Sequence, residues 1–165
     1  MAGKGISYRC LKYISDQTCY TINMSDLKFV SINGEPNPID KQVMIDGMLS
    51  YHASKGHVRK SETFSVVIKD QNEKLLGCVM VSFLWNGMSI QSLWVDDAVR
   101  GQGLGKKLMA MAEEEGVKRG CTIAYTDTFT WQAPGFYEKL GYKIYGKLEG
   151  FPEDNALSYF CKKLA

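Results

Sequence analysis

The sequence is poor in histidine and proline and has no large charge imbalance. It contains two histidines, four prolines, and 20 basic against 18 acidic residues, for a net charge of +2. So mild a charge argues against nucleic acid or an anionic membrane surface as a partner, but it tolerates an anionic ligand. The histidines, His52 and His57, lie near no cysteine in the sequence. A zinc site is therefore not expected, and we predict no bound metal.

The five cysteines form no CxxC pair, and the sequence lacks long apolar runs. An odd number of cysteines, at positions 10, 19, 78, 121 and 161, is typical of small buried thiols in a reducing compartment. No early segment has the pattern of a signal peptide, and no stretch of about 18 apolar residues could cross a bilayer. We therefore expect a cytoplasmic protein with no membrane partner.

The overall amino-acid composition is typical of one globular domain. Of the 165 residues, 45% are hydrophobic and 23% are charged. Such a chain can bury a core, but it is too short for two ordinary domains. We therefore expect a single domain over residues 1–165.

The first 60 residues carry the weakest pattern. Short strands are expected over residues 6–14 and 27–32, and a turn with two prolines follows at 33–40. Apolar residues then recur at helical spacing, so we expect Asp40 to cap a helix that ends near Lys55.

From Thr63 onwards the pattern is clearer. Strands are expected over residues 63–69, 75–85, 88–95, 121–129, 142–148 and 157–164. Asn86-Gly87 is a strong hairpin signal between the second and third of these strands. Helices are expected over Leu104–Lys118 and 132–141, with Gly120 and Gly141 as the residues that end them. The succession of strand, helix and strand around Leu104–Lys118 implies a right-handed crossover and a parallel pair, so the predicted fold class is α+β or mixed α/β.

The most informative segment is RGQGLG, residues 100–105, which lies between an expected strand and an expected helix. Backbone N–H groups at the start of a helix are unsatisfied, and the helix dipole adds partial positive charge there. Glycines let this backbone approach a phosphate closely. Arg100, Lys106 and Lys107 add charge, so the segment is a predicted anion site.

Two familiar nucleotide motifs do not fit this segment. A P-loop would require a glycine at the position of Arg100, and a serine or threonine at the position of Lys107. The dinucleotide fingerprint would require its third glycine at the position of Lys106. The anion is therefore not expected to belong to a nucleotide bound by either motif.

The spacing that fits is R-x-x-G-x-G, and a second motif follows about thirty residues later. The stretch APGFYEKLGY, residues 133–142, matches the pattern A-x-x-F-Y-x-K-x-G-[FY]. In this order, with one strand between them, the two motifs resemble those of the GNAT family of N-acetyltransferases. The resemblance covers about the last 100 residues, and the first 60 match only in outline.

The resemblance implies a fold and separate roles for the two parts of the chain. The fold would be a central mixed, mostly antiparallel sheet of about six or seven strands, with one splayed parallel pair and helices on both faces. Residues 63–164 would form an acyl-CoA-binding core, and residues 1–60 a variable part on the acceptor side. Dimers through the terminal strands are common in the family, so a homodimer is possible.

The resemblance also implies acetyl-CoA as cosubstrate and a set of binding residues. The strand before the glycine loop would bind the pantetheine arm through its backbone, with the acetyl carbonyl near the N–H of Val95. Thr130 stands where the family often has an asparagine, and Gln132 or Asp127 could replace it. The residues expected to bind acetyl-CoA are Leu93, Trp94, Val95, Arg100, Gly101, Gln102, Gly103, Leu104, Gly105, Lys106 and Thr130.

Tyr137, the tyrosine of the F-Y pair, is similar in position to the family's general acid. A thiolate that leaves a thioester benefits from a proton donor, and a phenol, with a pKa of about 10, suits a thiol with a pKa of about 8.5. The alternative is a core tyrosine on an apolar helix face. Pro134 and Gly135 lie inside the expected helix, so its start, and with it the position of Tyr137, stays open.

The chemistry implied by the resemblance is acetyl transfer from acetyl-CoA to a primary amine, of a small molecule or of a protein. The sequence does not single out a general base, and Asp96, Asp97, Asp127 and Glu62 are all candidates. The alternative function is a non-catalytic acyl-CoA sensor that kept the glycine loop and lost the chemistry.

Overall fold

The computed structural model describes residues 24–58 and 61–164. The chain divides into two compact units, Met1–Ile45 and Asp46–Ala165. The strand expected over residues 6–14 lies outside the described residues, as do Cys10 and Cys19. Cys78, Cys121 and Cys161 carry free thiols. Burial raises the pKa of the Cys121 thiol above its ordinary value.

The first unit contains the short 3-10 helix η1 (Met24–Asp26) and the start of helix α1 (Pro38–Ser54). The strand expected over residues 27–32 is wrong, because a strand needs a hydrogen-bonded neighbour and the described part of this unit holds none. The expected cap is also wrong. Asn37 caps α1, because its side-chain oxygen accepts the backbone N–H groups of Ile39 and Asp40, both at 3.0 Å.

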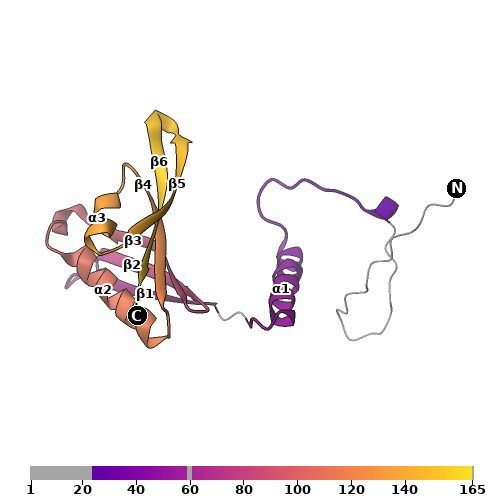
Figure 1. The fold of residues 1–165 in the computed structure, drawn as a ribbon, viewed down its shortest axis with the longest axis horizontal. Helices are drawn as coiled ribbons and strands as arrows, with labels where there is room; N and C mark the ends of the chain where they lie inside the picture. The colour runs from indigo at the N-terminus through magenta and orange to yellow at the C-terminus, as the bar shows by residue number, and fades with distance from the viewer. Residues whose placement is uncertain (1–23, 59–60, 165) are drawn as a thin grey trace. The chain divides into compact units, whose positions relative to one another are not determined.

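The second unit is built on one mixed sheet. Within its described residues, six strands lie in the order β1-β2-β3-β4-β6-β5 (Figure 1). The strands are β1 (Ser61–Lys69), β2 (Leu75–Leu84), β3 (Gly87–Val95), β4 (Ile123–Phe129), β5 (Lys143–Phe151) and β6 (Asn155–Lys163). The pair β3–β4 is parallel and the other pairs are antiparallel. The predicted sheet is thereby confirmed.

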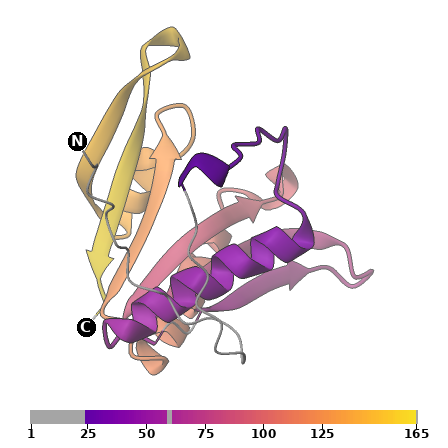
Figure 2. The ribbon, with the colours of Figure 1, turned by 90° about the vertical axis from the view of Figure 1, so that its right-hand side faces the viewer.

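The predicted turns join these strands. In the β1–β2 turn, the carboxylate of Asp70 accepts the N–H groups of Asn72 and Lys74 at 2.8 and 2.9 Å. The β2–β3 hairpin turns at Trp85 and Asn86, one residue earlier than the predicted Asn86-Gly87, and Trp85 has a φ of +53°. The β5–β6 hairpin is longer than predicted and turns through the short helix η3 (Pro152–Asp154). Figures 1 and 2 show it reaching beyond the end of β4.

Helices α2 (Leu104–Lys118) and α3 (Pro134–Lys139) cover the same face of this sheet (Figure 1). The fully buried side chains of α2 and the middle strands form one core, which includes Val79, Val81, Met88, Leu108, Met109, Ala112 and Phe160. The expected helix on the opposite face stays a prediction, as does the single-domain organisation. None of the helices in the described ranges is long and apolar enough to cross a membrane.

The parallel pair separates soon after it begins. Strands β3 and β4 pair at three positions, ending at Ser89 opposite Tyr125. One residue further along, the Thr126 hydroxyl donates to the Ile90 carbonyl at 3.2 Å, so a side chain replaces the backbone ladder. On its other edge β3 carries a bulge at Gln91, which shifts its register against β2. Beyond this point the two strands form the arms of an open V.

Candidate functional site

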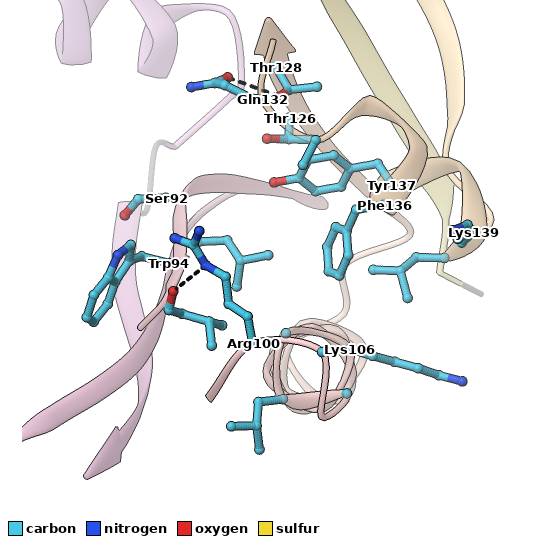
Figure 3. Close-up of a pocket in the computed structure, with 18 of the residues that line it drawn as sticks. Ser92, Trp94, Arg100, Lys106, Thr126, Thr128, Gln132, Phe136, Tyr137 and Lys139 are labelled. Atoms are coloured by element: carbon cyan, nitrogen blue, oxygen red, sulfur yellow. Dashed lines mark hydrogen bonds between the residues drawn. The ribbon is translucent and has the colours of Figure 1, made fainter. Parts of the chain in front are cut away.

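A cavity of about 1170 Å³ lies between the arms of the V. One wall consists of the end of β3, the glycine loop and the start of α2, and the other of β4, the turn after it and α3 (Figure 3). Of the residues expected to form a site, the structure brings to this cavity Leu93, Trp94, Val95, Arg100, Gly101, Gly103, Leu104, Gly105, Lys106 and Tyr137. The side chains of Gln102 and Thr130 lie outside its lining.

The glycine loop presents the start of α2 to the cavity. Gly101 and Gly103 both have a φ of +78°, a conformation that costs a side chain strain and glycine almost nothing. Gly103 is also the residue before the first turn of α2 and supplies no side chain to cap it. The first N–H groups of α2 are thus left for another acceptor, and the helix dipole favours a negatively charged one.

Arg100 holds the loop against the end of β3. Its Nε donates to the carbonyl oxygen of Val95 at 2.9 Å, and its Nη1 forms an ion pair with Asp97 at 2.5 Å. Figure 3 shows Arg100 turned toward the strand end, while Lys106 extends from the start of α2 on the other side. The two cations flank the uncapped helix start, so this wall of the cavity suits a pyrophosphate.

The two sequence motifs meet because Gly105 has no side chain. A Cβ atom at Gly105 would lie 3.3 Å from the ring of Phe136, which is closer than most real contacts of this kind. Helix α3 can therefore pack directly on the first turn of α2. This contact places the residue after Phe136, which is Tyr137, beside the glycine loop.

The start of helix α3, which the sequence left open because of Pro134 and Gly135, is defined in the structure. The proline occupies the first helical position, where its missing N–H and fixed φ are harmless. The helix therefore starts at Pro134, after Ala133, and Tyr137 falls on its buried side with 7% of its surface exposed. Its ring packs against those of Tyr142 and Phe160, each at a centroid distance of 5.8 Å.

The hydroxyl of Tyr137 points from this packed ring into the cavity, toward Thr126 (Figure 3). Burial raises the pKa of the Tyr137 phenol above its ordinary value, since a phenolate is poorly solvated there. The hydrogen bond with Thr126 acts in the opposite direction, and the negative charge of Asp127 raises the pKa further. The phenol therefore keeps its proton at neutral pH and is available as a donor.

The turn after β4 uses its polar side chains to hold its own shape. The Thr130 hydroxyl lies 3.1 Å from the carbonyl and 2.8 Å from the N–H of Ala156, and so ties the turn to β6. This commitment explains why Thr130 stays outside the cavity lining. Gln132 lines the cavity, and its Oε1 accepts the Thr128 hydroxyl at 3.0 Å and the Phe129 N–H at 2.9 Å.

Of the four carboxylates considered as a general base, Asp127 lines the cavity. Glu62 forms an ion pair with Arg119, and Asp97 is paired with the loop arginine. Asp96 caps the short helix η2 (Asp97–Val99), since it accepts a backbone N–H of that helix. Their engagement elsewhere makes Asp127 the carboxylate best placed to meet a substrate.

Some cavity residues carried no signal in the sequence. Ser92 and Trp131 line the cavity but lie outside the two motifs. Lys139 also lines the cavity and is the fixed lysine of the second motif, but the motif assigned it no role. The bulge at Gln91 was also unforeseen, because bulges follow from how two strands pair and not from one strand's own pattern.

The comparisons with known proteins agree with this geometry. The model of the acetyltransferase (GNAT) family matches residues 31–142. The chain is 30% identical to an acetyltransferase of Agrobacterium fabrum over 118 residues, which cover 72% of this chain and 86% of the relative. It is 32% identical to a blasticidin-S acetyltransferase of Streptomyces morookaense over 107 residues, covering 64% of this chain and 79% of the relative.

A solved structure shows the same fold. The crystal structure of an acetyltransferase from Bacillus cereus superposes with a TM-score of 0.70 at 29% sequence identity, covering 81% of this chain and 97% of that chain. The overall fold is therefore shared with a protein named an acetyltransferase.

Proposed function

This chain belongs to the GNAT family of acetyltransferases, and from that premise we propose that it transfers the acetyl group of acetyl-CoA to a primary amine by direct attack of the amine on the thioester. One observation carries the proposal. An uncapped helix start, flanked by cations, and a buried tyrosine hydroxyl face the same cavity. The first is suited to a pyrophosphate and the second to a leaving thiolate.

We assign acetyl-CoA to the wall formed by β3 and α2. The amides of residues 102–106 would receive the pyrophosphate, and Arg100 and Lys106 would balance its charge. Within the described strands, β3 pairs with β4 no further than Ser89, so the rest of this edge can accept the pantetheine arm as an added strand. The remaining residues of the proposed site are Leu93, Trp94, Val95, Gly101, Gly103, Leu104 and Gly105, with Thr130 acting indirectly by holding the neighbouring turn.

Acetyl-CoA supplies an acetyl group activated as a thioester, and the residues around it serve that transfer. The N–H of Val95 would stabilise the negative charge that develops on the acetyl oxygen. As the new carbon–nitrogen bond forms and the carbon–sulfur bond breaks, Tyr137 Oη gives its proton to the departing sulfur. The acceptor nitrogen loses a proton to solvent, and the phenolate of Tyr137 recovers one.

A small-molecule amine is the acceptor class we favour. One relative of this chain is named a blasticidin-S acetyltransferase, so its acceptor is a small molecule. Asp127 is the acidic residue of the described cavity lining, and its carboxylate lies near Tyr137, whereas Arg100 and Lys106 lie on the α2 wall and Lys139 lies at the end of α3. A protonated amine would be drawn toward Asp127, away from the cations that hold the pyrophosphate.

The direct test is release of free thiol from acetyl-CoA in the presence of a panel of primary amines. We expect release that depends on both the amine and the enzyme, with the acetylated amine detected by mass spectrometry. Tight binding of CoA with no thiol release for any amine would contradict the proposal and would support the alternative, a non-catalytic acyl-CoA sensor.

The pH dependence of kcat/KM follows from the protonation states required. The amine must be neutral to attack, and its neutral fraction grows about tenfold per pH unit below a pKa of about 10. Burial raises the pKa of Tyr137 above 10.0, so the acid stays protonated over the same range. We expect kcat/KM to rise steadily up to about pH 9, with no descending limb before about pH 10.

Asp127→Asn tests the charge that attracts the amine. The KM for the amine should rise severalfold, while the KM for acetyl-CoA should stay the same, because Asp127 lies away from the cationic wall. In the pH profile of the wild-type enzyme, a fall in kcat/KM near pH 8 would argue against Tyr137 as the acid. An unchanged amine KM in Asp127→Asn would remove Asp127 from acceptor binding.

A further inference from the structure

Trp131 is a large aromatic side chain that lines the cavity and still has 56% of its surface exposed. Nothing in the proposed chemistry uses it, since acetyl-CoA and the proton donor are accounted for by other residues. A solvent-exposed tryptophan is energetically unfavourable at a surface that contacts only water, because its large apolar area stays hydrated. Its position on the β4 wall of the cavity therefore calls for a ligand.

The ring is held in one orientation by packing. The indole of Trp131 stacks on the ring of Phe129, with centroids 4.2 Å apart and planes 8° apart. Phe129 in turn meets Phe151 edge-on, at 4.8 Å and 80°, which connects the stack to the end of β5. One face of the indole is thus covered by Phe129, and the exposed surface belongs to the rest of the ring.

The backbone that carries the ring is fixed as well. On one side of Trp131, the N–H of Thr130 donates to the Ala156 carbonyl at 3.0 Å, and the hydroxyl of Thr130 also contacts the Ala156 backbone. On the other side, the N–H of Gln132 donates to the Phe129 carbonyl at 2.9 Å, and the Gln132 side chain accepts the Phe129 N–H. A ring anchored in this way loses little entropy when a ligand stacks on it.

We propose that Trp131 is a stacking platform for the acceptor, and that the acceptor is an amine with a flat π-group, either an aromatic ring or a guanidinium, beyond the reacting nitrogen. The inference rests on the proposed acetyl transfer and names the substrate class for the same cavity. Indole faces attract flat π-systems by stacking and cations by their quadrupole. A guanidinium is both flat and cationic, and Asp127 on the same strand wall adds an attractive charge.

The nucleotide of CoA is the competing occupant of the platform. The geometry places it elsewhere, because its pyrophosphate belongs at the glycine loop on the α2 wall, between Arg100 and Lys106. Trp131 follows β4 on the opposite wall, next to Gln132, which Figure 3 shows across the cavity from these two cations. The acceptor must approach from the side that the pyrophosphate does not occupy.

The experiment compares pairs of amines that differ in the flat group alone. We expect kcat/KM to be roughly threefold to tenfold higher for phenylethylamine than for cyclohexylethylamine, and for agmatine than for 1,6-diaminohexane, which carries a second cation but no flat group. In Trp131→Leu both ratios should fall to about one, with the KM for acetyl-CoA unchanged. Trp131→Phe should keep part of the preference. A preference in the agmatine pair alone would identify the flat group as a guanidinium, and in the phenylethylamine pair alone as an aromatic ring.

Trp85→Leu is the matched control, since Trp85 is similarly exposed, at 48%, and lies outside the cavity lining. It should leave both ratios as in the wild type. Ratios near one in the wild-type enzyme, or ratios that survive in Trp131→Leu, would overturn the proposal. A higher KM for acetyl-CoA in Trp131→Leu, with acceptor preference intact, would also overturn it and assign the platform to the nucleotide.

Binding of the same amines to the CoA-bound protein, measured by calorimetry, separates this proposal from the proposed reaction. Preferential binding of phenylethylamine or agmatine that Trp131→Leu removes would support the platform even if no amine were acetylated. If amines were acetylated but those with a flat group bound no more tightly than the others, the proposed acetyl transfer would stand and the role of Trp131 as a stacking platform would be contradicted.

Discussion

Replacing Tyr137 with phenylalanine should lower kcat by about a hundredfold or more while leaving the KM for acetyl-CoA within about twofold of wild type. The ring contacts with Tyr142 and Phe160 survive the change, because phenylalanine keeps the ring. Thr126 keeps its hydrogen bond to the Ile90 carbonyl. The variant therefore loses a proton donor that matters in the transition state and little else. Initial rates of thiol release at varied acetyl-CoA would measure both constants.

Tyr142→Phe is the control for this variant. Tyr142 is also buried, at 2% exposed, but its hydroxyl donates to Glu113 at 2.9 Å and it lies outside the cavity lining. Loss of this hydrogen bond in Tyr142→Phe should lower the free energy of unfolding by about 1–2 kcal/mol and leave kcat nearly unchanged. If kcat of Tyr137→Phe stays within about threefold of wild type, Tyr137 is a core residue and another group supplies the proton.

Replacing Gly103 with valine should raise the KM for acetyl-CoA by an order of magnitude or more. A side chain at this position would project from a backbone that lines the cavity, and the φ of +78° would add strain of about 1–2 kcal/mol. Both effects act on the approach of a pyrophosphate to the start of α2. The acetyl-CoA dependence of the rate, and calorimetric binding of CoA, would measure the loss.

Gly120→Val separates these two effects. Gly120 has a φ of +81°, lies just past the other end of α2, and has open space where a Cβ would be placed. The substitution introduces the same kind of backbone strain far from the cavity. It should lower the melting temperature as Gly103→Val does, but leave the KM for acetyl-CoA unchanged. Equal effects of the two substitutions on KM would mean that strain, and not blocked access, weakens binding.

The elements after Thr63 were predictable because their signals are local. Alternation of apolar residues marks strands, and Asn86-Gly87 marks a hairpin, as each depends on a few neighbouring residues. Each predicted strand and helix in this part was found, with ends that differ by a few residues. The error at residues 27–32 has the same origin, since an apolar run cannot show whether a partner strand exists.

The two motifs were also readable from the sequence, but their meaning depended on being brought together. Neither RGQGLG nor APGFYEKLGY contains information about its distance from the other in space. Gly105 and Phe136 settle that distance by direct packing, and Pro134 settles the start of α3. Thr130 shows the limit of motif matching, because its hydroxyl is committed to Ala156.

The sequence by itself determined the family resemblance and the order of the strands along the chain, and it predicted the anion loop and the candidate acid, because each depends on residue types at short spacing. The tertiary structure decided where the parallel strands part, which carboxylate faces the cavity and which way Trp131 is presented. These features arise from the bulge at Gln91, the Thr126 contact and ring stacking between strands, all of which join residues that are distant in the chain or depend on strand pairing.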